Sequence, residues 1–447
     1  MCSDMGRQTD TAADGDEALS GKGRWFNRNV FAFGLTSFLT DFCHEMATAV
    51  LPQFMQAIGA SAWALGSIEG VSDATSSFVK LGAGFHSDRI GHRKGWSVIG
   101  YALTAAGIFV ITFAFAWPLI LIARAVGWLG RGIRGPLRDA MLADAVEPED
   151  RGKAFGFHRA GDTAGAVAGP LAAFGLLSLA AAHPAVANAV IGWIPGLSGS
   201  NGWTFRVIFL LSLVPGLLSV ATMAFMVREK RRAANHEMRF WGTIRAMPRE
   251  YRSFLLAVGL FGIADFAPTL MILRATTVLE PKLGLLAAAR IAALLYTLRN
   301  VVYALASFPI GALSDRFSRT RYLAVGYGVA VVTFLGFAFV LSPSVWWFVI
   351  FFSLAGVFIA WEDTMEGVAV RDYVRTEIAG TAYGVLGVVN GVGDFVSSLV
   401  VGLLWAAVGP MAGFIYAAVI GLAGTILMAS LRSHTHADKA AAGPRQP

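Results

Sequence analysis

The segment GFHSDRIGHRK at residues 84–94 has a second, altered copy, GALSDRFSRTR, at residues 311–321. A further pair of similar segments, DAVEPEDRGKAFG at 144–156 and DYVRTEIAGTAYG at 372–384, lies almost the same distance apart along the chain. Because the two pairs of matching segments have nearly the same separation along the chain, they indicate that a structural unit was duplicated. We therefore expect a fold with two related halves.

The composition indicates a membrane protein, because the 447 residues are 55% hydrophobic and only 15% charged. Apolar runs of about 20 residues, the length that crosses the hydrocarbon layer as a helix, recur along the chain. A soluble all-helical protein, the alternative, would show shorter amphipathic runs of about 10 to 14 residues. We predict an all-α polytopic membrane protein with about twelve spans, at 29–52, 62–85, 96–116, 118–141, 154–180, 204–226, 252–278, 286–313, 322–342, 345–369, 379–407 and 410–431.

The predicted domains are a cytoplasmic tail (1–28), a six-helix bundle (29–226), a cytoplasmic connector (227–251), a second six-helix bundle (252–431) and a cytoplasmic tail (432–447). Lys and Arg gather in the connector and in the loops on its side of the membrane, and the positive-inside rule places that side in the cytoplasm. The first tail has no apolar segment of the kind found in a signal peptide. The first span is therefore expected to target the chain to the inner (plasma) membrane.

The net charge of +7 does not indicate nucleic-acid binding, because the basic residues lie in the short loops that the topology requires. Cys2 and Cys43 are the two cysteines of the sequence, and they define no disulfide framework. The expected partners are the lipid bilayer, a small-molecule or ion substrate and protons. No cofactor is expected, and the protein is expected to be a monomer.

Three motifs resemble those of the major facilitator superfamily. The first is the loop after the second span, where the matching residues are Gly84, Asp88, Arg89, Gly91 and Arg93. RAVGWLG at 124–130 resembles the fourth-helix arginine motif, and GAVAGP at 165–170 resembles the fifth-helix glycine–proline motif of the antiporter branch. The resemblance implies two pseudo-symmetric six-helix bundles and transport by alternating access.

Residues of these motifs are candidates for gating. Asp88, flanked by Arg89 and Arg93, can form charge pairs with a neighbouring helix end and so latch one state. Gly165, Gly169 and Pro170 give one helix face small residues and a proline, which permit close approach or a bend. Ordinary helix packing is the alternative explanation for these three residues.

A polar stripe runs along the first span. At helical periodicity one face of this span carries Ser37, Asp41, His44, Glu45 and Thr48. Asp41 lies roughly 18 Å into the span, near the bilayer midplane. Ionisable groups at this depth are functional candidates by default. The alternative is a buried network that only fixes helix packing.

Other spans add candidates for substrate binding or proton coupling, namely Asp265 on the seventh span, Glu69 and Asp73 on the second, and Arg299 on the eighth. If the halves face each other, Asp41 and Asp265 are expected to lie across one cavity. Buried carboxylates and histidine can load and release protons. This polar interior is more than an inert scaffold needs.

The fourth and tenth spans carry opposite charges at matching repeat positions. Arg131, Arg134 and Arg138 share a face of the fourth span, and Arg134 and Arg138 align with Glu362 and Glu366 of the tenth. We interpret these residues as an interdomain ion-pair gate that forms when the cytoplasmic side closes. Binding of an anionic substrate by the arginines is the rival interpretation.

These features predict a secondary active transporter that exports a small organic molecule in exchange for protons. An exporter of nickel, cobalt or iron is an alternative, because oxygen, nitrogen and sulfur donors suit such metals. The candidate ligands are Asp41, His44, Glu45, Met46 and Asp265. A non-transporting membrane sensor is an alternative of another class. An enzyme is not expected, since the sequence shows no nucleophile–base motif, HExxH spacing or nucleotide loop.

The first testable prediction concerns topology. A reporter enzyme fused after Arg232 or at the C-terminus should report the cytoplasm, and one inserted within 195–201 should report the exterior. The basic loops require this arrangement. A cytoplasmic signal from 195–201 would contradict the twelve-span topology.

Overall fold

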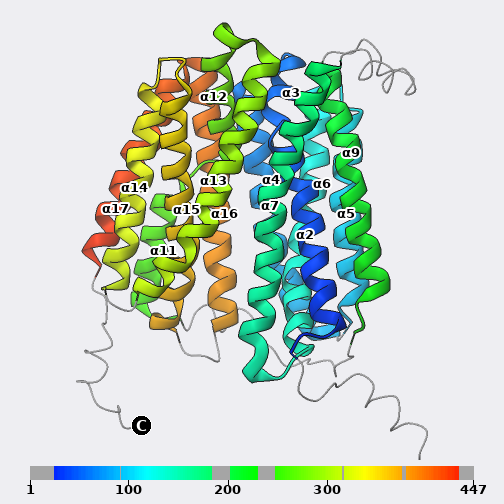
Figure 1. Cartoon of the computed structure of the whole chain (residues 1–447). Helices are drawn as coiled ribbons and strands as arrows, with labels where there is room; N and C mark the ends of the chain where they lie inside the picture. Colours follow the sequence, from blue (N-terminus) through cyan, green and yellow to red (C-terminus); the bar gives the residue numbers. More distant parts are fainter. Residues whose placement is uncertain are drawn as a thin grey trace, which may run out of the picture.

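The structure is a computed structural model that describes residues 25–90, 92–183, 202–229, 247–314, 317–374 and 379–431. Within these ranges every regular element is helical, and most helices run the length of the molecule (Figure 1). The predicted all-α polytopic class is confirmed. Most of the connector, most of the first tail, the second tail and the segment 195–201 lie outside the described residues.

The N-terminal half is built from consecutive helices that pack on one another (Figure 1). They are α2 (Arg28–Thr48), α3 (Leu51–Ala57), α4 (Ala62–Ile90), α5 (Lys94–Thr112), α6 (Trp117–Asp144), the short η1 (Pro148–Asp150), α7 (Arg151–Ala182), α9 (Trp203–Ala221) and the π-helical end η2 (Thr222–Met226).

The C-terminal half repeats this arrangement beside it. It comprises α11 (Arg249–Gly262), α12 (Pro268–Leu283), α13 (Leu285–Leu313), α14 (Arg319–Phe339), α15 (Val345–Tyr373), α16 (Ala379–Ala407) and α17 (Pro410–Ser430). In Figure 1 the two halves stand side by side, and the described chain begins and ends on the same side of the molecule.

The first span of each half is interrupted, whereas the sequence predicted continuous helices over 29–52 and 252–278. In the N-terminal half the break separates α2 from α3 at Ala49 and Val50. In the C-terminal half it is longer and covers 263–267, so Asp265 lies on non-helical backbone. Pro52 and Pro268 stand in the first turns of the resumed helices, where proline is tolerated because its missing N–H needs no partner there.

Eight of the described helices are long and apolar enough to cross a membrane. They correspond to eight of the about twelve predicted spans. The four others fall on α2, α4, α6 and the interrupted pair α11–α12, which are either rich in ionisable residues or broken. Helices of this kind need protein or water around their polar groups. The candidate residues of the sequence lie mainly on these helices.

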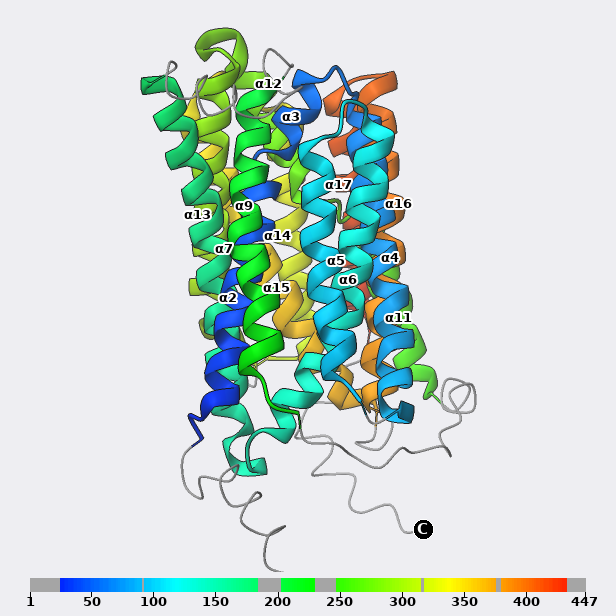
Figure 2. The same cartoon turned by 90° about the vertical axis from the view of Figure 1, so that its right-hand side faces the viewer.

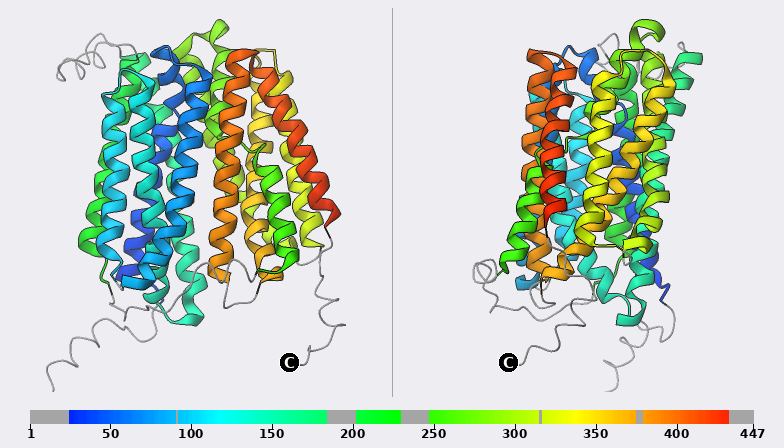
Figure 3. Two further views of the ribbon diagram at one scale, coloured as in Figure 1. Left: turned by 180° about the vertical axis from the view of Figure 1, so that it is seen from behind. Right: turned by 90° about the vertical axis from the view of Figure 1, so that its left-hand side faces the viewer.

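The two halves meet along two helix pairs, α4 with α16 and α7 with α13 (Figures 2 and 3). Glycines permit the first contact. A Cβ atom on Gly66 would lie 2.2 Å from the carbonyl oxygen of Ser398, and one on Gly402 would lie 2.7 Å from that of Ala62. Both distances are shorter than van der Waals contact, so the helix axes could not approach this closely with larger residues.

Gly165 and Gly169 permit a similarly close contact between two helices, α7 and α2, inside the N-terminal half. A Cβ atom on Gly165 would lie 2.4 Å from the carbonyl oxygen of Phe38, and one on Gly169 would lie 2.7 Å from that of Phe42. Pro170 lies inside α7, which continues on both sides of it. Close packing of α7 on α2 therefore explains the two glycines in this structure, and a gating role remains a prediction.

Polar contacts join the halves at the end farthest from the termini, where α3 meets α12 (Figure 1). The side chains of Gln53 and Thr276 lie 2.9 Å apart, and Gln56 donates a hydrogen bond to Glu280. The halves are thus held together at this end.

The glycine contact gives the second prediction. Gly66→Ala should lower the free energy of unfolding by about 1–3 kcal/mol, because the added methyl group meets the backbone of α16. Gly82→Ala on the same helix is the matched control, since a Cβ atom there has no neighbour within 4 Å. Thermal unfolding of the two purified variants measures the difference. Equal melting temperatures would show that the α4–α16 crossing is not tightly packed.

Candidate functional site

The polar stripe of α2 faces the interior of the protein and reaches both halves. The hydroxyl of Ser37 donates to Asp162 of α7 at 2.6 Å. Farther along the stripe, Tyr296 of α13 donates its hydroxyl to Glu45 at 2.7 Å. His44 lies with its ring edge-on to Trp128 of α6, and the ring centroids are 5.2 Å apart. The stripe therefore joins α2 to three other helices.

Asp41 lies between charges of both signs. Its electrostatic partners are Asp162, Glu45, Arg131 and Arg134, all in the N-terminal half. The partners of Asp265 are Glu362, Asp363, Glu366 and Arg299, all in the C-terminal half. The two aspartates thus belong to separate clusters in this structure.

Glu69 and Arg124 form a buried ion pair between α4 and α6. One guanidinium nitrogen lies 2.6 and 2.8 Å from the two carboxylate oxygens, and the side chains are only 4% and 6% exposed. Removing one partner of such a pair leaves an uncompensated buried charge, so the pair is costly to break. One turn farther along α4, Asp73 interacts electrostatically with Glu69 and with Lys80.

Four carboxyl groups gather in the C-terminal half, and we call them the C-half carboxyl cluster. They are Asp265 at the helix break, Glu362 and Glu366 of α15, and Asp394 of α16. Asp265 and Glu362 interact electrostatically with each other, and one carboxyl oxygen of Glu362 has no hydrogen-bond partner in the described structure.

Glu366, the second member of the cluster on α15, accepts hydrogen bonds from two neutral side chains. Tyr327 donates to one oxygen of Glu366 at 2.5 Å, and Asn390 donates to the other at 2.6 Å. Arg299 is a cation near Asp265, but its guanidinium group donates a hydrogen bond to Asn300 at 3.1 Å. Among the described residues no Lys or Arg forms an ion pair with a member of the cluster.

The backbone of the break that carries Asp265 is held by side chains of α16 and α17. Ser397 donates to the carbonyl of Asp265, and the hydroxyl of Ser398 accepts from the N–H of Ala267 at 3.0 Å. Tyr416 donates to the carbonyl of Ile263 at 3.0 Å. These bonds replace helical ones, as non-helical backbone at membrane depth requires.

The predicted gate pairs are apart in this structure. Arg138 binds Asp139 at 3.0 Å and lies 3.4 Å from the hydroxyl of Ser37. Arg134 lies over the ring of Tyr101, 4.7 Å from its centroid. Their proposed partners belong to the C-half carboxyl cluster. A gate that forms in another state is not tested by this one, so both pairs remain predictions.

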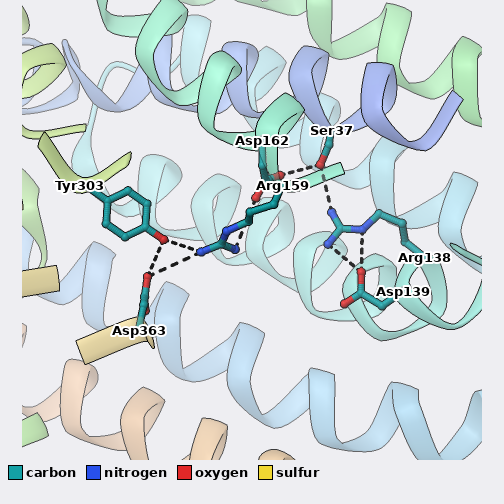
Figure 4. A network of polar contacts seen from close by, with 7 residues as sticks. All are labelled: Ser37, Arg138, Asp139, Arg159, Asp162, Tyr303 and Asp363. Atoms are coloured by element: carbon teal, nitrogen blue, oxygen red, sulfur yellow. Dashed lines mark hydrogen bonds and ion pairs between the residues drawn. The ribbon is translucent and has the colours of Figure 1, made fainter. Parts of the chain in front are cut away.

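Arg159, Tyr303 and Asp363 form a polar bridge between the halves, which the sequence did not predict (Figure 4). Arg159 of α7 hydrogen-bonds to the hydroxyl of Tyr303 on α13 and lies 3.9 Å from Asp363 on α15. Tyr303 also donates to Asp363 at 2.9 Å. Arg159 lies 3.8 Å from Asp162 one turn along its own helix. That i, i+3 spacing was the one signal of this bridge in the sequence.

Ion pairs also tie helix ends together on the side of the termini. Arg93 pairs with Asp144 at the end of α6 at 2.9 Å, and Arg319 pairs with Asp372 near the end of α15 at 3.0 Å. The two pairs occupy similar places in the two halves. The side chains of Asp88 and Arg89 lie outside the described part of the structure, so their predicted pairing is not visible.

The candidate metal ligands do not form one site. Among the described residues no three His, Cys, Asp or Glu side chains are grouped so that they could hold a metal ion. Met46 is 3% exposed and packs in the apolar core.

Comparison with known proteins identifies the family. A family model described as Major Facilitator Superfamily matches residues 33–293 and 283–447. The chain belongs to the Major Facilitator Superfamily. An uncharacterized MFS-type transporter of Methanocaldococcus jannaschii is 29% identical over 409 residues, which cover 91% of this chain and 95% of the relative. An uncharacterized protein of Mycobacterium tuberculosis is 27% identical over 449 residues, which cover 93% and 95% of the two chains.

Solved structures share the superfamily fold. A mutant of the nucleoside transporter NupG superposes with a TM-score of 0.71 at 14% identity, over 90% of this chain and 98% of that one. A bacterial homologue of the human lysosomal transporter Spinster, in an inward-facing and unoccupied conformation, has a TM-score of 0.67 at 17% identity, over 92% and 95%. The resemblance inferred from the three motifs is confirmed, and the protein is a multi-pass membrane transporter of this superfamily.

The Arg159 bridge gives the third prediction. The side chains of this ion pair are partly exposed, 60% for Arg159 and 49% for Asp363. The pair should therefore stabilise the conformation that contains it by at most about 1 kcal/mol. Arg159→Asp should therefore shift the ratio of the two transporter conformations by up to about fivefold. Adding Asp363→Arg should restore the original ratio. Spin labels at the exposed positions Gly156 and Leu305 report the distance between α7 and α13.

The matched control is Lys153→Asp, because Lys153 pairs at 2.8 Å with Asp150 within the same half. This change alters charge on α7 without touching the C-terminal half. If it shifts the distance distribution as much as Arg159→Asp does, the bridge does not hold the halves together.

Proposed function

We propose that this transporter exports a small organic molecule in exchange for protons by alternating access. The observation that supports the proposal is the C-half carboxyl cluster, whose members interact electrostatically with one another and form no ion pair with a Lys or Arg among the described residues. Carboxyl groups that lie close together repel each other when both are ionised, and a bound proton relieves this repulsion. Chains of intramembrane carboxyl groups are typical of proton relays.

The position of the cluster supports coupling between protonation and movement. Asp394 interacts electrostatically with Asp73 and Lys80 of α4, across the contact between the halves. When the halves move relative to each other, these charges separate and the protonation equilibrium of the cluster changes. By reciprocal linkage, a change in protonation then favours one arrangement of the halves. Asp41, Glu45 and Glu69 are proposed to extend this coupling or substrate site into the N-terminal half.

An organic substrate is favoured over a metal ion by two findings. The described structure groups no metal-binding set of side chains. In addition, a protein of Cupriavidus pinatubonensis named as a probable 4-methylmuconolactone transporter is 26% identical over 180 residues, 40% of this chain. The antiporter-like motif at 165–170 favours exchange with protons, and thus export.

The gate is proposed to form in the opposite conformation. Arg134 and Arg138 would then leave Tyr101 and Asp139 and pair with Glu362 and Glu366. The basic loops favour an inner-membrane location with both termini in the cytoplasm. We propose that the monomer is the working unit.

The fourth prediction tests proton coupling. A growth screen of cells with and without the gene, across metals and toxic organic compounds, first identifies a substrate. In liposomes, Asp265→Asn should then reduce transport driven by a pH gradient to the rate of protein-free vesicles, because the amide cannot exchange a proton. Substrate-for-substrate exchange should continue, since that cycle needs no change in protonation.

Glu250→Gln is the control, because this exposed carboxyl group lies at the start of α11, away from the cluster. It should leave both modes unchanged. Asp41→Asn in the same assay shows whether the N-terminal half shares the coupling. Full gradient-driven transport by Asp265→Asn would overturn the role assigned to the cluster, and loss of both modes would indicate substrate binding instead.

A further inference from the structure

A small cavity inside the N-terminal half is lined by hydrogen-bond donors. It lies between α2, α5 and α6, apart from the C-half carboxyl cluster, and has a volume of about 20 Å³. Gly107 and Gly127 are among its lining residues, and a Cβ atom on Gly127 would have no neighbour closer than 3.8 Å. The polar side chains that line it are His44, Thr104, Arg124, Trp128, Arg131 and Arg134.

Two of the three arginines that line this cavity have no direct ion-pair partner among the described residues. Arg124 is neutralised by Glu69. Neither Arg131 nor Arg134 has a carboxylate within 4.0 Å among the described residues, although Arg134 is only 4% exposed. Asp41 interacts electrostatically with both arginines, and Glu45 and Asp73 interact with Arg131. None of these carboxylates makes an ion-pair contact with either guanidinium group in the described structure.

The unpaired guanidinium groups rest on aromatic faces. The guanidinium carbon of Arg131 lies 4.5 Å from the ring centroid of Trp128, and that of Arg134 lies 4.7 Å from the ring centroid of Tyr101. A ring face attracts the positive charge of the guanidinium group, but it accepts no hydrogen bond from the N–H groups at the guanidinium edge. The buried Nε of Arg134 and the indole nitrogen of Trp128 have no acceptor in the described structure.

Buried donors without acceptors, beside two guanidinium groups that no carboxylate contacts in the described structure, require an anion or water. We propose that this cavity binds a monatomic anion of the size of chloride or bromide. A cavity of about 20 Å³ holds about one water-sized particle, which a monatomic anion matches. The anion accepts from Arg131, Arg134 and the indole N–H of Trp128.

This site lies apart from the C-half carboxyl cluster, and it is tested on purified full-length protein without any substrate or pH gradient, so its outcome does not depend on the proposed proton coupling. Thermal unfolding is followed in sodium chloride or bromide, with sodium gluconate replacing them at constant ionic strength. A ligand that binds only the folded state raises the melting temperature as its concentration increases. Chloride and bromide should stabilise the protein with saturation, and gluconate should not.

Variants at the cavity should change the anion affinity in opposite directions. Arg134→Gln should weaken it by about 10- to 100-fold, the effect expected for losing a charge-assisted hydrogen bond. Asp41→Asn should strengthen it, because a competing negative charge is removed. Gly127→Ala keeps every charge and places a methyl group in the cavity, so it should weaken bromide binding more than chloride binding.

Lys153→Gln is the matched control, since it removes one positive charge from an exposed side chain of α7. It should leave the chloride response unchanged. Equal stabilisation by chloride and gluconate would show an ionic-strength effect and overturn the site. So would a chloride response that survives both Arg134→Gln and Gly127→Ala, because the anion would then bind elsewhere. If Arg134→Gln does not fold, Gly127→Ala and Asp41→Asn still decide the outcome.

Discussion

Hydrocarbon offers no hydrogen bonds, and this constraint governs where the chain can depart from a helix. Most spans satisfy their backbone within one continuous helix. The break at 263–267 is possible because Ser397, Ser398 and Tyr416 bind the backbone groups that the helix leaves free. Asp265 consequently lies on irregular backbone at membrane depth, where it interacts electrostatically with Glu362. Substrate and ion sites of many secondary transporters are built at broken helices of this kind. The serine and tyrosine side chains are therefore part of the site, although they contact no carboxyl oxygen in the described structure.

Hydrocarbon also makes an unpaired charge costly, and the surplus buried charges of the two halves are opposite in sign. The N-terminal half carries its surplus of arginines on α6, where they rest on aromatic rings or pair with Glu69 and Asp139. The C-terminal half carries its surplus of carboxyl groups on α15 and at the α11–α12 break. The internal repeat of the sequence aligns Arg134 with Glu362, residues of opposite charge. Such a pair is attractive when the halves approach on that side, and each member needs other partners when they separate. The structure supplies neutral donors to Glu366 and an aromatic face to Arg134.

The sequence predicted the helical fold and most of the residues that line the interior, because intramembrane charges are rare and the helical repeat places them on one face. It did not predict the break in the seventh span. The signal was present in Asp265 and Pro268, since a proline disfavours helix in the residue before it, but apolar length outweighed it. The Arg159 bridge was missed for another reason: Arg159, Tyr303 and Asp363 come from three helices, and only tertiary packing brings them together. The predicted gate pairs are not formed in this structure, because Arg134 lies on the ring of Tyr101 and Arg138 pairs with Asp139.

A transporter needs two arrangements of its halves that differ by only a few kcal/mol, and the contacts between the halves fit this requirement. At the end farthest from the termini, Gln53 and Gln56 make hydrogen bonds to α12 that water can replace when that end opens. Nearer the termini, Arg159 and Asp363 are largely exposed, so their attraction is weak and easily exchanged. Next to the first of these zones, the glycines at the start of α4 and the end of α16 bring backbone against backbone. Contacts of that kind tolerate rotation about the crossing point better than separation, because no long side chains interlock there. The crossing can therefore act as a pivot, and the polar contacts of both zones, which are formed together in this structure, are weak enough to exchange when the halves move.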